Sequence, residues 1–214
     1  PLWRLLQATA SAVQAMRQGQ SLTAQLERVP QDLRPGVQAL SFQVLRQWGR
    51  ANALREQLAA KAPPPAADAL LCTALALAWD PQKAPYAPHT LVDQAVEAAK
   101  RDRATTGQSG FLNACLRRFL REREALVAAT ASDPVALWNH PAWWIGRLRA
   151  DHPDHWQAIL RAGNAAPPLT LRVNRLRTTP EALAQRLADA GLATRRCGED
   201  GLVLETPRPV QAIP

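Results

Sequence analysis

The residues PHTLVDQAVEAAKR (88–101) and SGFLNACLRRFLRE (109–122) decide the fold of this 214-residue chain. In both stretches apolar side chains recur every three or four positions, which is the spacing of one face of an α-helix. The apolar positions are Leu91, Val92, Ala95, Val96 and Ala99 in the first stretch and Phe111, Leu112, Cys115, Leu116, Phe119 and Leu120 in the second. We therefore expect two helices, over residues 89–102 and 108–129, with a short loop between them.

The same helical spacing continues upstream through the first half of the chain. It predicts helices over residues 2–18, 21–29, 32–49, 51–61 and 66–79. The last of these is apolar nearly all round, so it is predicted to be the central helix of a bundle. Because no stretch up to this point has the pattern of a strand, the sequence predicts an all-α domain over residues 1–130.

The pattern changes after residue 130. The expected elements are helices over residues 141–150, 154–163 and 180–190 and short strands over residues 169–174, 192–197 and 201–206. In LTLRVN (169–174) apolar and polar residues alternate, as in a half-buried strand. Thr179 is the expected N-cap of the last helix and Gly191 its stop. The sequence thus predicts a mainly α protein, in which a helical bundle precedes a small α/β region over residues 131–214.

Charge gives the first indication of a partner. The chain has 26 Lys and Arg residues against 18 Asp and Glu, a formal net charge of +8, and lysine occurs only at Lys61, Lys83 and Lys100. Arginine suits two-pronged contacts with phosphate, which favours nucleic-acid binding. An Arg-rich and Ala-rich composition unrelated to function is an equally open interpretation. No run of about 18 apolar residues is present, so we expect no membrane-spanning helix and no membrane partner.

The densest group of cations lies at and after the two deciding stretches. Its members are Lys100 and Arg101 at the end of the first stretch, Arg103 just after it, Arg117, Arg118 and Arg121 in the second stretch and Arg123 just after that. Asp102 and Glu122 are the acidic residues among them. Arg117 and Arg121 are four residues apart and should share one helix face. Such a group can neutralise several phosphates, so we predict an RNA-binding surface here. A solvated helix face without a partner is the alternative.

A second candidate surface lies on the polar side of LTLRVN. Arg172, Asn174 and Arg175 are placed to contact the phosphate or sugar of RNA, although exposed strands also carry such residues for solubility alone. The pair Trp143-Trp144 also stands out, because two adjacent helix residues cannot both face the same core. We expect one of the two to contact another domain or a partner.

Motifs for catalysis are missing from the sequence. Gly107-Gln-Ser-Gly110 lies between two helices and is too short to hold a nucleotide, and no Gly-rich loop joins a strand to a helix. Cys72, Cys115 and Cys197 form no CxxC pair, and the four histidines lack metal-ligand spacing. We expect no catalytic residue, no cofactor site and no metal site in this chain. Its few cysteines fit a reducing, cytoplasmic location.

Residues 88–101 and 109–122 together resemble the NusB-like family, whose members have a similar V-D/N-x-A-V-x-x-A-K segment, a short loop and a G-F-V/L-N-x-V/C-L-R segment. Three later segments resemble the region before the catalytic domain of Sun-type (RsmB) 16S rRNA methyltransferases. They are HPAWW (140–144), GNAAPPLTLRVN (163–174) and LETPRPVQAIP (204–214). The two resemblances, in this order, cover nearly the whole chain.

The resemblance implies the front part of an S-adenosylmethionine-dependent enzyme that methylates cytosine C5 in small-subunit ribosomal RNA during ribosome biogenesis. In that family two cysteines and the Gly-rich cofactor loop act in a methyltransferase domain that follows, and no cysteine of this chain matches those motifs. The chain is then expected to bind no cofactor and to perform no turnover by itself. Its expected partners are small-subunit rRNA and its own downstream methyltransferase domain.

Two other functions stay open at this point. The first is a stand-alone NusB-like antitermination factor, although such a protein would end near residue 130. The second is a scaffold, whose helical bundle packs on the catalytic domain without touching RNA. The basic residues between positions 100 and 123 weakly oppose the scaffold.

Overall fold

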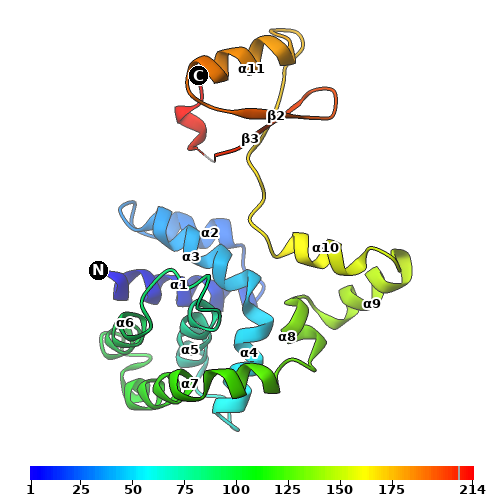
Figure 1. Cartoon of the computed structure of the whole chain (residues 1–214). Helices are drawn as coiled ribbons and strands as arrows, with labels where there is room; N and C mark the ends of the chain where they lie inside the picture. Colours follow the sequence, from blue (N-terminus) through cyan, green and yellow to red (C-terminus); the bar gives the residue numbers. More distant parts are fainter. Residues whose placement is uncertain (207) are drawn as a thin grey trace. The chain divides into compact units, whose positions relative to one another are not determined.

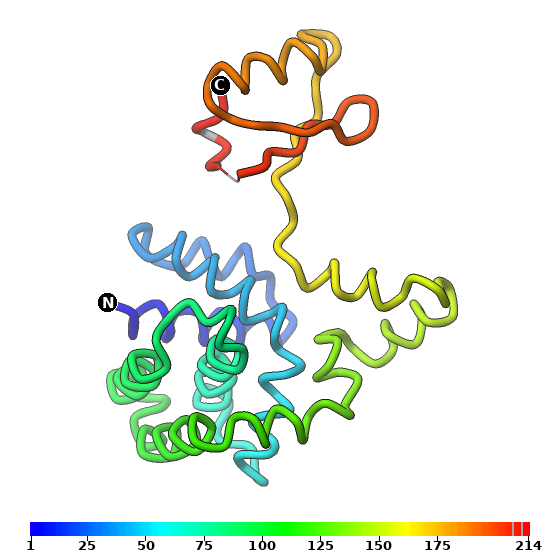
Figure 2. The backbone as a smooth tube through the Cα atoms, viewed as in Figure 1, coloured from blue at the N-terminus to red at the C-terminus, as the bar shows by residue number. Residues whose placement is uncertain are grey.

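The computed structural model describes residues 1–206 and 208–214, and the chain divides into two compact units, Pro1–Asn164 and Ala165–Pro214 (Figure 1). Along the tube in Figure 2 the first unit runs from blue to yellow and is all-α, and the second ends in red and contains a small sheet. The predicted fold class, a mainly α protein with a helical bundle before a small α/β region, is confirmed.

The helices of the first unit follow the apolar periodicity of the sequence. They are α1 (Leu2–Arg17), α2 (Leu22–Arg28), α3 (Arg34–Arg46), α4 (Trp48–Leu58), α5 (Pro65–Ala78), α6 (Pro88–Lys100), α7 (Ser109–Ala129), α8 (Pro134–Trp138), α9 (Ala142–Asp151) and α10 (Trp156–Gly163). The seven helices predicted up to residue 130 are all present. The break between the third and fourth falls at Gln47 rather than near residue 50, so Gly49 lies inside α4.

α5 is the centre of the bundle, as its composition predicts. Every residue from Ala67 to Ala78 is buried, and α5 contacts α1, α3, α4, α6 and α7. The surrounding helices direct their largest apolar side chains at it, including Leu6, Val13, Val44, Leu54, Leu91, Leu112, Leu116 and Phe119. Burial of these side chains against a helix that is apolar on all sides is the main force holding the unit together.

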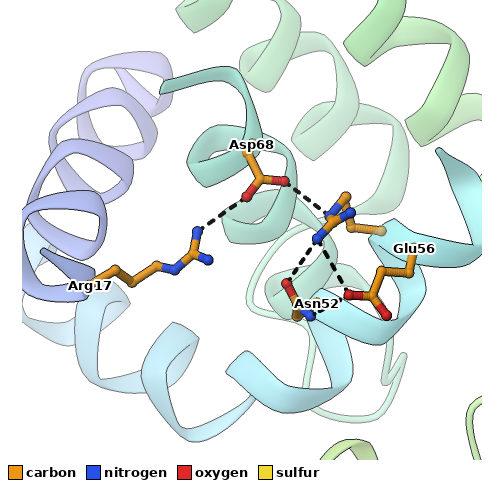
Figure 3. A network of polar contacts seen from close by, with 5 residues as sticks. Arg17, Asn52, Glu56 and Asp68 are labelled. Carbon is orange, nitrogen blue, oxygen red and sulfur yellow. Dashed lines mark hydrogen bonds and ion pairs between the residues drawn. The ribbon is translucent and has the colours of Figure 1, made fainter. Parts of the chain in front are cut away.

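One charged side chain, Asp68, lies within this apolar helix and is 5% exposed. Its Oδ2 accepts a hydrogen bond from Nη1 of Arg17 in α1 at 3.1 Å (Figure 3). Nε of Arg55 in α4 lies 3.0 Å from Oδ1 as an ion pair, without the alignment of a hydrogen bond. Arg55 is held in turn by Asn52 and Glu56. Because a buried carboxylate is stable only when paired, the network fixes how α1 and α4 sit against α5.

We expect Asp68→Asn to lower the free energy of unfolding by about 3 kcal/mol, since it removes the buried counter-charge of Arg55 and leaves that guanidinium only the exposed Glu56. Urea denaturation measures this loss. The matched control is Asp32→Asn, which breaks the exposed pair between Arg4 and Asp32 and should change stability by less than about 1 kcal/mol. Equal losses in the two variants would show that the buried network does not hold the helices.

The helical unit continues past residue 130 because α8 docks on the start of α4. Asn139, in the left-handed conformation with φ 53°, accepts a hydrogen bond from the backbone N–H of Arg50 at 2.9 Å. The buried Arg50 guanidinium donates to Oγ1 of Thr130 at 2.6 Å, at the end of α7. Burial lowers the pKa of Arg50, and the nearby Asp133 carboxylate opposes this shift. The segment from 131 to 164 therefore folds with the bundle.

Gly49 makes this contact possible. A Cβ at this position would lie 2.3 Å from the carbonyl oxygen of Val135 in α8. The glycine therefore allows the two helices to approach each other closely. α8 itself was not predicted, because five residues are too few to show a helical period.

Gly49→Ala should lower the free energy of unfolding by about 1–3 kcal/mol, because the added methyl group overlaps the backbone of α8. Thermal or urea unfolding gives the magnitude. Gly146→Ala in α9 is the control, since a Cβ there meets nothing within 4 Å and alanine favours a helix. Stability of Gly49→Ala equal to or above that of Gly146→Ala would contradict the docking of α8 on α4.

The second unit is a helix packed on a three-stranded antiparallel sheet. Its elements are β1 (Thr170–Arg172), α11 (Pro180–Asp189), β2 (Thr194–Cys197), β3 (Gly201–Leu204) and a short 3-10 turn (Val210–Ala212), with strand order β1-β3-β2. Thr179 caps α11 by accepting a hydrogen bond from the N–H of Ala182 at 3.2 Å, and Gly191 ends the helix region with φ 73°. Both roles are as predicted. In the described part of the chain, no helix has the length and apolarity to cross a membrane.

Candidate nucleic-acid interface

The predicted basic cluster is divided between two places on the α6–α7 pair. Lys100 ends α6, and Arg101 and Arg103 follow it in the turn. Arg117 and Arg121 lie farther along α7, beside the first turn of α6 and His89. Lys100 lies eleven positions after His89 on α6, which is a rise of about 16 Å at 1.5 Å per residue. The two groups therefore lie near opposite ends of α6 and are not one continuous cluster.

Arg117 and Arg121 line a surface hollow of about 190 Å³ between the two helices. The other lining residues are His89, Val92 and Asp93 of α6 and Leu120 of α7, and together the six define the α6–α7 hollow. The four-residue spacing of the two arginines places both on the hollow, as the sequence predicts. The hollow is thus lined by two guanidinium groups, an imidazole, two apolar side chains and one carboxylate.

Neighbouring carboxylates compensate some of the predicted cations but not others. Arg101 pairs with Glu97 and also lies over the ring of Trp3, 4.7 Å from its centroid. Arg118 pairs with Glu122 at 2.9 Å. Among the residues that the structure describes, Lys100, Arg103, Arg117 and Arg121 form no ion pair, and all four are exposed. These four offer their full charge to a phosphate.

The second candidate surface lies at the end of β1. Arg172, Asn174 and Arg175 line a hollow of about 370 Å³ with Val173 and Asp200. Arg175 forms an ion pair with Asp200, so its charge is partly compensated. Asn174 accepts a hydrogen bond from the N–H of Leu176 at 3.0 Å, which shapes the turn after the strand. Of the three predicted residues, Arg172 has the most available charge.

Three lining residues were not identified from the sequence. His89 and Asp93 are four residues apart on the polar side of α6, so the helical period that places Arg117 and Arg121 could also have indicated them. Asp200 could not be found in this way, because 25 residues separate it from Arg175 and only the β2–β3 turn brings the two together.

The pair Trp143-Trp144 is exposed on α9, with Trp143 71% and Trp144 36% accessible. Ile145 and Leu148 of the same helix face inward instead. The two indole rings meet edge to face, with centroids 5.6 Å apart. Neither ring belongs to the core of the first unit, so the prediction that one of them contacts another domain or a partner stays a prediction.

The cysteines have the properties of packing residues. Cys72 and Cys115 are buried and Cys197 is exposed. Burial, helped by the Asp68 carboxylate, raises the pKa of the Cys72 thiol to about 12, and burial also raises the pKa of Cys115. Thiolate is the reactive form, so neither buried cysteine is activated. Within the described residues, no group of His, Cys, Asp and Glu side chains is placed to hold a metal ion.

In the native chain only Cys197 should react readily with a thiol reagent such as DTNB at pH 8, because it alone is exposed. We expect one equivalent of thiol to react quickly and three after unfolding in guanidinium chloride. Cys197→Ser removes the fast phase and serves as the control. Rapid reaction of two or three thiols in the folded chain would contradict the burial of Cys72 and Cys115.

Family models match both parts of the chain. The model described as "NusB family" matches residues 4–121, which is more than half of the chain. The chain belongs to the NusB family. A second model, "Methyltr_RsmF/B-like, ferredoxin-like domain", matches residues 140–211. A NusB region before an RsmF/B-like ferredoxin-like domain is the order that the sequence motifs indicate.

Relatives of this NusB-family chain match it over nearly its full length. It is 36% identical to the ribosomal RNA small subunit methyltransferase B of Pseudomonas putida and 31% identical to that of Vibrio cholerae, in each case over 97% of this chain and 49% of the relative. The chain thus spans about half the length of these curated relatives. Its resemblance to the front part of the Sun-type (RsmB) family is confirmed.

One solved structure has the same fold over nearly the whole chain. The crystal structure of PH0851 aligns with a TM-score of 0.61 over 98% of this chain and 50% of that one, at 16% sequence identity. At this identity the likeness extends to the fold alone. The nine predicted RNA-contacting residues are not tested by any of these matches and stay predictions.

Proposed function

We propose that the chain is the RNA-binding and RNA-positioning part of an S-adenosylmethionine-dependent 16S rRNA methyltransferase that acts on cytosine C5. The relatives that match it over nearly its whole length are named ribosomal RNA small subunit methyltransferases, which supports rRNA as the substrate of the full protein. Residues 1–130 form the proposed RNA-binding domain. Residues 131–214 form the proposed lead-in to a methyltransferase domain that completes the enzyme in the cytoplasm.

The observation that carries the RNA-binding role is the α6–α7 hollow. Arg117 and Arg121 face the same hollow, are exposed, and have no carboxylate partner among the described residues. Each guanidinium can donate two parallel hydrogen bonds to a phosphate. Lys100 and Arg103 form a second, separate positive group at the other end of α6. A backbone phosphate in the hollow and another near the α6 end are the proposed contacts.

In this proposal catalysis belongs to the part of the relatives that this chain does not span. The cofactor, S-adenosylmethionine, and the nucleophilic cysteine are assigned to the downstream domain. One property of this chain supports that division: burial raises the pKa of both Cys72 and Cys115, so neither thiol is activated. The chain's own contribution is to bind the RNA and orient it.

A scaffold that packs on the catalytic domain without touching RNA is the second candidate. Trp143, with 71% of its surface accessible, favours it, because so large an exposed indole is typical of a protein contact. A stand-alone antitermination factor is less well supported, since the ferredoxin-like match over residues 140–211 has no place in it.

The RNA-binding role is tested by fluorescence anisotropy of this chain with a small-subunit rRNA hairpin at several salt concentrations. We expect the double variant Arg117→Gln/Arg121→Gln to bind roughly tenfold more weakly, and to reduce the slope of log K against log salt by about 1.4 to 1.8 for two lost phosphate contacts. Circular dichroism establishes that the variant is folded.

The matched control is Arg101→Gln/Arg118→Gln, which removes the same charge from residues that pair with Glu97 and Glu122. We expect a smaller loss of affinity and little change in slope. If the two double variants lose affinity equally, only the net charge matters and the hollow is not the site. No binding by the unaltered chain would favour the scaffold.

A further inference from the structure

The strand register gives the small sheet of the second unit two different faces. Side chains of directly paired residues lie on the same side of a sheet, and successive residues alternate. Leu202 of β3 pairs with Leu171 of β1 and with Arg196 of β2, so these three share one face. Val203 pairs with Thr170 and with Arg195, so these three residues share the opposite face of the sheet.

α11 covers the first face. Leu202 and Leu204 form a buried cluster with Leu183 and Leu187 of α11. Arg196 lies on this side as well, and its Nη1 is 3.3 Å from Oε1 of Glu181 at the start of α11. A hydrogen bond from its own backbone and the charge of Arg196 both lower the pKa of Glu181. Arg196 is therefore engaged within the unit.

The second face, which we name the open face, consists of Thr170, Arg172, Val203, Arg195, Gly201 and Cys197. Val203 at its middle is only 4% exposed, whereas Thr170, Arg172, Arg195 and Cys197 are all exposed. Val203 is not part of the buried cluster that α11 forms with Leu202 and Leu204. The accessible part of the face is thus its polar rim.

Two arginines dominate that rim. Arg172 is on β1 and Arg195 is on β2, the two outer strands, whose backbones are about 10 Å apart in a three-stranded sheet. Among the described residues neither forms an ion pair, in contrast to Arg175 and Arg196. Gly201, between Arg172 and Cys197, has no side chain to fill the surface there. The open face therefore has two guanidinium groups, on its two outer strands, that form no ion pair among the described residues.

We propose that the open face binds a single-stranded segment of RNA, with Arg195 as a contact that complements Arg172. Exposed sheet faces bind unpaired nucleotides because guanidinium planes can stack on bases and donate to phosphates, whereas a duplex is recognised by its shape. Two exposed cations without an ion pair among the described residues suit the phosphates of an RNA strand, so we take RNA rather than a protein as the occupant. The proposal rests on the proposed RNA-binding function.

The adjacent residues Arg195 and Arg196 provide a charge-matched test, because they lie on opposite faces of one strand. We expect Arg195→Gln to weaken binding of a single-stranded rRNA oligonucleotide roughly tenfold in anisotropy, and to reduce the salt slope by about 0.7 for one lost contact. Arg196→Gln removes the same charge from the α11 side and should bind within twofold of the unaltered chain. Equal effects of the two changes overturn the proposal.

Cys197 gives a second readout that needs no loss-of-function variant. It is exposed on the open face, so saturating single-stranded RNA should slow its alkylation several-fold in the unaltered chain. An unchanged rate overturns the proposal even if Arg195→Gln fails to fold. The Arg117→Gln/Arg121→Gln variant, measured in parallel, separates the two ideas. If the unaltered chain binds RNA through the α6–α7 hollow but Cys197 is not protected, only the open face is wrong. If the chain binds no RNA, both fail.

Discussion

The pairing of Asp68 with Arg17 and Arg55 is the constraint on which the helical unit depends. α5 is apolar on every side, and the hydrophobic effect alone would let it rotate among its neighbours with little preference. A carboxylate that is 5% exposed removes that freedom, because it must meet the guanidinium groups of α1 and α4. Arg17 also lies over the Trp48 ring, 4.7 Å from its centroid. This cation–π contact links the first residue of α4 to the same arginine that binds Asp68.

Once α5 is fixed, the positions of the functional side chains follow from it. α5 contacts both α6 and α7, so their common orientation places the first turn of α6 beside the middle of α7. Whether an arginine can then bind a phosphate with its full charge depends on whether a carboxylate four residues away pairs with it. Glu97 and Glu122 compensate Arg101 and Arg118, whereas Arg117 has only the neutral Asn113, whose oxygen accepts its hydrogen bond at 2.9 Å. Net charge thus says less about binding than the placement of carboxylates.

The two family matches and the two compact units do not divide the chain at the same residue. The ferredoxin-like model begins at residue 140, but α9 and α10 fold within the first unit, which ends at Asn164. The reason is local: α8 is anchored on α4 through Asn139 and Gly49, and Asn164 donates a hydrogen bond to the carbonyl of Trp138 at 2.6 Å. Segment 134–164 is therefore the structural connection between the NusB region and the sheet.

The sequence by itself determined the elements and the family. Apolar spacing is a local property, so the seven helices up to residue 130, the Thr179 cap and the alternation in LTLRVN could all be predicted, and the NusB-like motifs could be read directly. Only the tertiary structure decided the surfaces. The separation of Lys100 from Arg117, the pairing of Arg175 with Asp200 and the opposite faces of Arg195 and Arg196 depend on which distant segments meet. Such contacts form between residues far apart in the chain, and no local pattern encodes them.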